Sequence, residues 1–106
     1  MYSDALLTDI LRRTRSIAVV GVSTNPVRPS FYVARYLSLK GYRVIPVNPG
    51  HAGKELFGET VRATLADIDE PVDMVDIFRA KEFVMEITQA AIKTGVAVIW
   101  TQEGIV

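Results

Sequence analysis

The residues best suited to chemistry lie in the segment VVGVSTNPVRPSF, residues 19–31, which follows an apolar run. This segment contains Gly21, the hydroxyl groups of Ser23 and Ser30, and the cationic side chain of Arg28. Hydroxyls, loop amides, an arginine and the N-terminus of a helix that begins near Ser30 are all groups that bind phosphate. The segment is therefore a candidate phosphate-binding loop.

The loop lacks most of the glycine fingerprint of dinucleotide sites. A G-x-G-x-x-G pattern would be expected after the first strand, but Gly21 is followed by Ser23 and Pro26 at the next two fingerprint positions. The second strand is predicted to end at the neutral Asn48, where an NAD site keeps an acid that accepts hydrogen bonds from the ribose. These departures favour a phosphate-rich ligand that has no bare ribose diol.

Further candidates stand where other predicted strands end. In an open doubly wound sheet, ligands bind beyond the carboxyl ends of the strands, at the point where the strand order reverses. Phosphate-binding groups, two cations and two aromatic rings are expected to gather at this edge. The candidate ligand-binding residues are Gly21, Val22, Ser23, Arg28, Pro29, Ser30, Asn48, Pro49, Phe78, Arg79, Trp100 and Gln102.

Short apolar runs that alternate with helical patterns predict the elements that position these loops. Valine-rich runs are typical of strands buried on both faces, and apolar residues spaced three and four apart predict amphipathic helices. The predicted strands cover residues 17–22, 42–50, 59–61, 72–78 and 96–100. The predicted helices cover residues 3–14, 30–40, 64–68 and 81–95.

This alternation predicts an α/β fold, a Rossmann-like doubly wound parallel sheet with helices on both faces. The expected strand order is 3-2-1-4-5, with the strand from Ile17 to Val22 in the centre because it has the most apolar run. A length of 106 residues fits one domain, residues 1–106, with a modest core.

The composition excludes several classes of function. Twelve Lys and Arg residues balance twelve Asp and Glu residues, so the net charge gives no indication of nucleic-acid binding. The chain has no cysteine, and its one histidine, His51, has no second histidine with which to form a metal site. No apolar run approaches the roughly 18 residues of a membrane span, and no signal sequence is apparent. We therefore expect a cytoplasmic protein without a membrane partner.

The motifs at successive strand ends resemble those of a known family. G-x-S-x-N-P-x-R-P-S after the first strand is followed by V-N-P-G after the second and by W-x-Q-x-G after the last. This combination resembles the small CoA-binding proteins, which are stand-alone relatives of the CoA-binding domain of succinyl-CoA synthetase α subunits. The resemblance runs from about Ser16 to the C-terminus.

The resemblance implies a role for each part of the predicted edge. The loop from Val22 to Ser30 would lie against the CoA phosphates, with Arg28 as a charge partner, and Asn48 with Pro49 would border the adenosine. The remaining candidates would follow the ligand towards its thiol end. These are Phe78 and Arg79, beside the nucleotide or the start of the pantetheine arm, and Trp100 and Gln102, along that arm.

The same residues also have purely structural explanations. Gly21 allows a tight turn after the first strand, and Ser30 fits a helix N-cap. Phe78 and Trp100 fit packing positions, and an exposed arginine is by default a solvated cation. Two acidic side chains, Asp73 and Asp76, point to opposite faces of a strand and so form no acid–base pair, and His51 is expected to be solvated.

Three functions remain open from the sequence. The first is binding of CoA or an acyl-CoA, without catalysis by this chain alone, because no convincing nucleophile, base or metal site is present. The second is an NAD(P)-dependent oxidoreductase or a fragment of one, which rests on fold analogy alone. The third is a regulatory or interaction subunit of a CoA-using enzyme. Similar proteins usually continue for another helix and strand beyond the position of Val106, so we expect either that one side of the site is open or that the sequence is truncated there.

Overall fold

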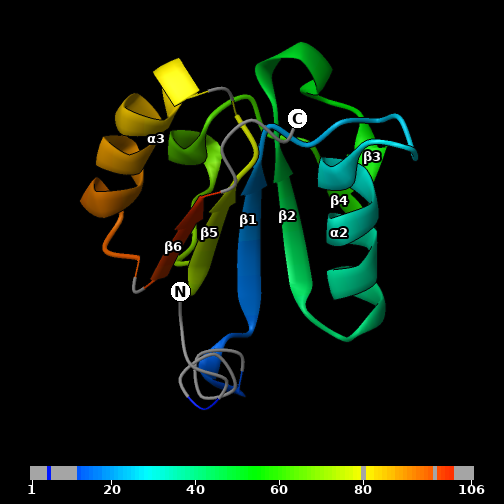
Figure 1. Ribbon diagram of the computed structural model, residues 1–106, viewed down its shortest axis with the longest axis horizontal. Helices are drawn as coiled ribbons and strands as arrows, with labels where there is room; N and C mark the ends of the chain where they lie inside the picture. The colour runs from blue at the N-terminus through cyan, green and yellow to red at the C-terminus, as the bar shows by residue number, and fades with distance from the viewer. Residues whose placement is uncertain (1–4, 6–11, 80, 97, 102–106) are drawn as a thin grey trace.

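The computed structural model describes residues 5, 12–79, 81–96 and 98–101. Its centre is a parallel sheet of four strands in the order β2-β1-β5-β6, as Figure 1 shows. The strands are β1 (Ser16–Val20), β2 (Arg43–Val47), β5 (Met74–Ile77) and β6 (Val98–Thr101). The predicted α/β class is confirmed, and β1 takes the central place that its apolar run predicts.

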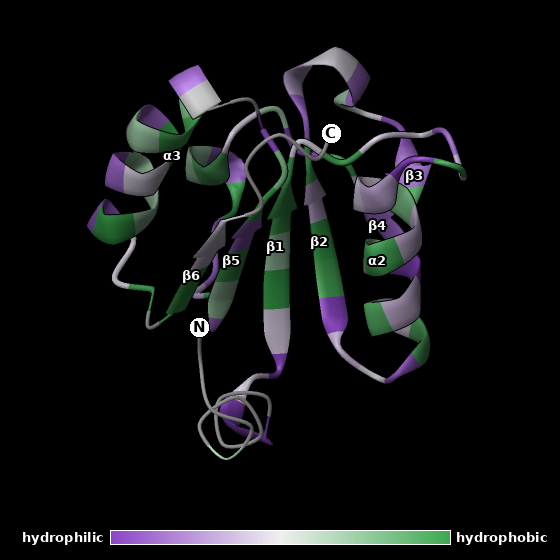
Figure 2. Cartoon of the chain, in the orientation of Figure 1, coloured by the Kyte–Doolittle hydropathy of each residue, from purple (hydrophilic) through white to green (hydrophobic). Residues whose placement is uncertain are grey.

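Two helices cover opposite faces of this sheet. Helix α2 (Pro29–Leu39) packs Ala34 against Ile17 and Val19, whereas α3 (Lys81–Lys93) packs Ala91 against Ala18 and Val20. Successive side chains of a strand point to opposite faces, so the apolar run of β1 supplies both cores. The hydropathy colours of Figure 2 show this run as a hydrophobic strand between its covering helices.

The topology creates a switch point, the place on the sheet edge where the chain leaves neighbouring strands in opposite directions. From β1 the chain passes through α2 to β2 on one side, and from β5 it passes through α3 to β6 on the other. The ends of the strands are level, because Val20 pairs with both Val47 and Ile77. The loops after β1 and β5 therefore diverge above the same edge, which is where this fold class binds ligands.

The predicted strand order is wrong in its outermost strand. The segment near 59–61 was expected at the edge of the sheet, but β4 (Glu59–Thr60) pairs antiparallel with β3 (Glu55–Leu56) in a separate hairpin. The turn places Phe57 at φ 55° and Gly58 at φ 77°. Two positive φ angles allow a two-residue hairpin turn, and the Phe57 ring is held 5.3 Å from the ring of Phe31.

After the hairpin the described chain forms one isolated bridge with β2. Arg62 forms a parallel bridge with Val47, its N–H donates to the Pro46 carbonyl at 3.0 Å, and its own carbonyl accepts from the Asn48 N–H at 2.8 Å. The helix predicted over 64–68 is the short 3-10 helix η2 (Leu65–Asp67). A second 3-10 turn, η1 (Pro49–His51), follows β2.

Some predictions fall on residues that the structure does not describe. Most of the predicted helix over 3–14 lies outside the described residues, as does Gln102. Among the helices that are described, none is long and apolar enough to cross a membrane. The cytoplasmic location stays a prediction.

An ion-pair cluster ties the hairpin to the amino end of the sheet. Glu59 accepts from Arg43 Nε at 3.0 Å and from Arg62 Nη1 at 3.1 Å, and Arg43 also pairs with Glu70. The hydrogen bonds from Arg43, with a smaller contribution from Arg62, lower the pKa of Glu59 against the opposing effect of its partial burial. The cluster attaches to β2 the hairpin whose second strand was predicted as an edge strand of the sheet.

We expect Glu59→Gln to remove a pH-dependent part of the stability. Because folding lowers the pKa of Glu59 from its ordinary value of 4.5, its contribution is present above that value and is lost as the pH falls through the lowered pKa. The variant should lose about 0.5–1 kcal/mol of unfolding free energy at pH 7, and this loss should shrink as the pH falls from 4.5 towards 3. Urea titrations across this range measure it. Glu55→Gln, on the neighbouring strand, is the control, and an equal effect of the two variants would contradict the account.

Candidate functional site

Gly21 is the point at which the loop after β1 touches the loop after β5. A Cβ atom added there would lie 2.2 Å from the carbonyl oxygen of Phe78 and 2.7 Å from Cδ of Arg79. Its φ of 87° is also one that side chains rarely adopt. The glycine therefore permits both the turn and the close approach of the two loops at the switch point.

Asn48 joins the loop after β2 to the loop after β1. Its Nδ2 donates to the carbonyl oxygen of Val22 at 2.8 Å, and its Oδ1 accepts from the N–H of Gly50 at 2.9 Å. The second bond caps the η1 turn. Donor and acceptor are both engaged, so an amide suits this position for structural reasons alone.

The candidate phosphate loop is held in shape by its own side chains. The N–H of Ser23 donates to Oγ of Ser30 at 2.9 Å, Oγ of Ser23 accepts from the N–H of Asn25 at 3.0 Å, and Oδ1 of Asn25 accepts from the N–H of Val27 at 3.1 Å. Ser30 is fully buried. The loop is thus preorganised, and part of the hydrogen-bonding capacity predicted for phosphate serves the loop itself.

A cavity of about 300 Å³ opens beside these loops, on the face of the sheet that α3 covers. This volume is at the lower end of the range for small-molecule sites. Its floor is made by Val20 and Val47, the last residues of β1 and β2. The full lining is Val20, Gly21, Val47, Pro49, Ala63, Thr64, Leu65, Arg79, Phe83, Glu86, Ile87 and Ala90.

Arg79 forms the charged wall of the cavity next to the switch point. Its side chain passes Gly21, and its guanidinium carbon lies 4.7 Å from the centroid of the Phe83 ring. Stacking on an aromatic face orients a guanidinium without neutralising it. The predicted ligand residues Gly21, Pro49 and Arg79 thus meet in one cavity.

Comparisons with known proteins identify the family of this chain. Residues 15–106 match the model of a family described as CoA binding domain. This chain belongs to the CoA binding domain family. It is 38% identical over 104 residues to the uncharacterized protein YneT of Bacillus subtilis, covering 98% of this chain and 76% of that protein.

Two solved structures with the same fold are similar to nearly the whole of this chain. A Thermus thermophilus protein, cell-free ID.343, is 42% identical, with a TM-score of 0.91 and coverage of 99% of this chain and 78% of that one. A hypothetical protein from Pyrococcus horikoshii OT3 is 36% identical, with a TM-score of 0.87 and coverage of 93% of this chain and 68% of that one. These likenesses extend the family assignment to the three-dimensional fold.

This CoA binding domain does not bring every predicted site residue into the cavity. Phe78 is fully buried in the core beneath α2, so its side chain is structural, while its carbonyl contacts the Gly21 turn. Trp100 pairs in register with Asp76, whose neighbours Met74 and Phe78 face the α2 core. Trp100 therefore lies on the face of the sheet opposite the cavity.

One wall of the cavity is formed by residues that were not predicted as site residues. Ala63, Thr64 and Leu65 come from the segment around η2, which has little periodicity, and Glu86 with Ala90 come from the flank of α3. A signal was present for α3, because Phe83 is spaced four residues from the packed Ile87 but is 41% exposed beside Arg79. An aromatic residue at the edge of the packed face marks the cavity rim.

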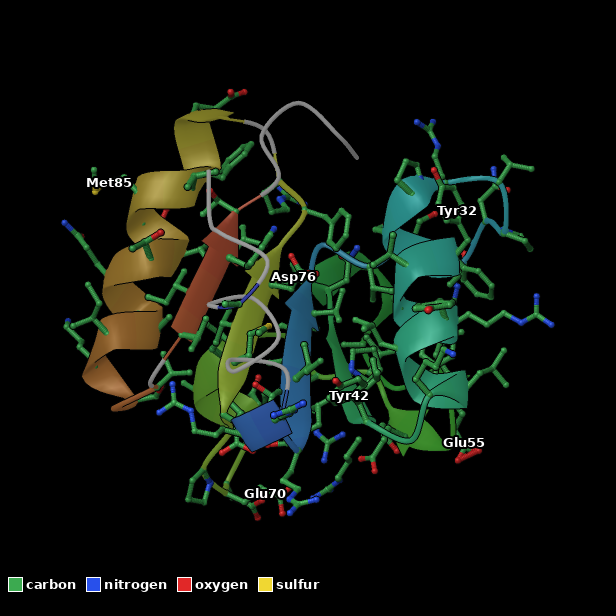
Figure 3. All side chains as sticks on the ribbon, turned by 60° about the horizontal axis from the view of Figure 1, so that its bottom comes forward. Tyr32, Tyr42, Glu55, Glu70, Asp76 and Met85 are labelled. Carbon is green, nitrogen blue, oxygen red and sulfur yellow. The ribbon has the colours of Figure 1, made fainter. Side chains whose placement is uncertain are left out.

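Asp73 and Asp76 lie at different places in the fold. Asp73 accepts from the N–H groups of Arg15 and Ser16, at 2.8 and 3.1 Å, at the amino end of the sheet. Asp76 is buried further along β5, as labelled in Figure 3. Within the described part of the chain, no group of three or more His, Cys, Asp or Glu residues is placed to hold a metal ion.

Proposed function

We propose that this domain binds CoA, or an acyl-CoA, across the carboxyl edge of its parallel sheet. The observation that carries the proposal is the cavity at the switch point, which joins an apolar floor to the cation of Arg79 in a chain of this family. A nucleotide base fills apolar space, and an arginine beside it suits a phosphate. The cavity thus offers apolar space for the base and a cation for a phosphate.

The nucleotide end of CoA fits the side of the cavity formed by Pro49 and the segment before η2. Thr64 supplies a polar group on the cavity wall. His51 and Lys54 follow Pro49 in the sequence, and Lys54 Nζ lies 3.4 Å from His51 Nδ1. In this proposal the ammonium group of Lys54 supplies positive charge to the ribose phosphate of CoA. Asn48 beside them presents no carboxylate that would repel it.

The pyrophosphate and the pantetheine arm follow the edge away from the cavity. The preorganised loop 22–30 and the N-terminus of α2, with Arg28 at its cap position, lie beyond Gly21. The arm then continues towards β6, where Trp100 lies on the other face of the sheet. CoA would therefore cross the sheet edge above Gly21, with its base on the α3 side and its arm on the α2 side.

We infer a binding role without catalysis by this chain alone. The cavity wall holds one carboxylate, that of Glu86, and no histidine or hydroxyl is paired with it in the described structure. General acid–base chemistry needs such a pair within hydrogen-bond reach. An NAD(P) function is disfavoured because the end of β2 carries Asn48 rather than an acid.

Filling the cavity tests the proposal. Ala63→Phe places a ring in the space proposed for the base, so CoA affinity should fall by roughly tenfold or more, which corresponds to about 1.4 kcal/mol of lost contact. Isothermal titration calorimetry measures the loss. Ala52→Phe, an exposed alanine after η1, is the matched control and should bind as the unmodified protein does. Unchanged affinity in Ala63→Phe, with a cooperative unfolding transition, would place CoA elsewhere.

A further inference from the structure

The outer face of α2 carries an apolar stripe that nothing in the described structure covers. Tyr32, Tyr36 and Leu39 are spaced four and three residues apart, so they lie along one side of the helix. Their side chains are 53%, 58% and 74% exposed. Tyr32 is labelled on this side of the molecule in Figure 3, away from Met85 of α3. We call these three residues the α2 stripe.

The inner face of the same helix is already used. Ala34 is buried, and Val33 and Leu37 pack against the core cluster of the sheet. The α2 stripe is therefore a second apolar face on one helix, and the fold of this chain does not require it. Tyrosine and arginine are enriched at the centres of protein interfaces, and α2 presents both types on its outer side.

The charged residues of α2 and its C-cap that flank the α2 stripe, Arg35 and Lys40, are both cations. Arg35 lies beside Tyr32 and Leu39 on the helix surface, and Lys40 Nζ lies 5.4 Å from the centroid of the Tyr36 ring. Residues 10–54 contain no Asp or Glu, although they hold eight of the twelve Lys and Arg residues of the chain. The total charge is zero although residues 10–54 are basic, and the α2 stripe lies within these residues.

We propose that the α2 stripe binds a partner protein through an acidic amphipathic helix. Apolar side chains of such a helix would pack on Tyr32, Tyr36 and Leu39, and its acidic flanks would face Arg35 and Lys40. Two copies of this chain are poorly suited to meet through α2, because the cations of each copy would oppose those of the other. Nucleic acid suits the surface less well, because exposed Leu39 offers nothing to phosphate.

A labelled peptide tests this proposal with the full chain. The probe is a synthetic 21-residue helix with leucines on one face and glutamates on both flanks. Its controls are a scrambled peptide of the same composition and a version with lysine in place of glutamate. Fluorescence anisotropy should show saturable binding of the acidic helix at least tenfold tighter than either control. Chemical-shift changes in a ¹⁵N-labelled sample should centre on α2.

Two variants examine the residues that carry the proposal. Arg35→Glu and Tyr36→Ser should each weaken peptide binding by tenfold or more, whereas Ile92→Ser, at an exposed apolar position on α3, should leave it unchanged. Thermal unfolding of each variant verifies the fold, and CoA titration should be unaffected in all three. Equal binding of the acidic and lysine peptides, or insensitivity to Arg35→Glu, would overturn the proposal. Self-association lost in Tyr36→Ser, or tighter binding of an RNA oligonucleotide, would also overturn it by assigning the face to another partner.

Discussion

Gly21→Ala is expected to lower the free energy of unfolding by about 2–5 kcal/mol and to weaken CoA binding with it. A left-handed φ costs a side chain about 1–2 kcal/mol, and forcing atoms into a filled space costs a further 1–3 kcal/mol or so. The added Cβ would lie 2.2 Å from a backbone oxygen of Phe78, so the two loops must separate. Their separation would also move Arg79 away from the cavity.

Gly41→Ala is the matched control for this substitution. Gly41 has a φ of 99°, but no atom lies within 4 Å of the position its Cβ would take. Gly41→Ala should therefore lower the free energy of unfolding only by the cost of the left-handed φ, about 1–2 kcal/mol, and keep full CoA affinity. Urea titrations and calorimetry of both variants separate the two contributions. Equal losses in stability would mean that the contact between the two loops is not required.

Asn48→Asp is expected to weaken CoA binding by about 5- to 150-fold. A carboxylate at the end of β2 would stand about 6 Å from the ribose phosphate in the proposed pose, a repulsion of roughly 1 to 3 kcal/mol in a partly solvated cleft. Added salt should reduce the loss. Dephospho-CoA lacks that phosphate, so its affinity should fall much less.

The structure adds a second effect of the same substitution, which the two ligands share. A carboxylate has no N–H to donate to the carbonyl of Val22, so stability should fall by about 1–3 kcal/mol whichever ligand is present. Asn48→Ala loses that bond without gaining charge, so it should weaken the binding of CoA and of dephospho-CoA equally. The ratio of the two affinities isolates the charge effect. An unchanged ratio in Asn48→Asp would show that residue 48 does not face the ribose phosphate.

The sheet could be predicted from the sequence because its signals are local. The runs of β1 and β5 are mostly apolar and buried, and Gly41 and Gly95 follow the ends of the two helices with φ of 99° and 78°. The hairpin was missed because its turn is Phe57-Gly58, whereas phenylalanine rarely adopts a positive φ. Contact with Phe31, distant in sequence, stabilises that conformation. A tertiary contact of this kind leaves no periodic pattern.

The position of the candidate site could be predicted, but which of its side chains face a ligand and which bond to the backbone could not. Residues at strand ends must share an edge, so Gly21, Pro49 and Arg79 could be grouped from topology alone. Whether a polar side chain faces a ligand or its own backbone depends on geometry, and Asn48 and Ser30 face the backbone. A short helix could be predicted near Thr64, but its place in the cavity wall could not, because a 3-10 turn has too few residues to show which side is packed.

The central claim is that this domain binds CoA at the switch point, and one calorimetric comparison tests it most directly. The unmodified protein is titrated with CoA, acetyl-CoA, NAD and NADP under the same buffer and salt conditions. We predict saturable binding of CoA with one site per chain, and no measurable heat from NAD or NADP at the same concentrations. Saturable binding of NAD or NADP without binding of CoA would contradict the account.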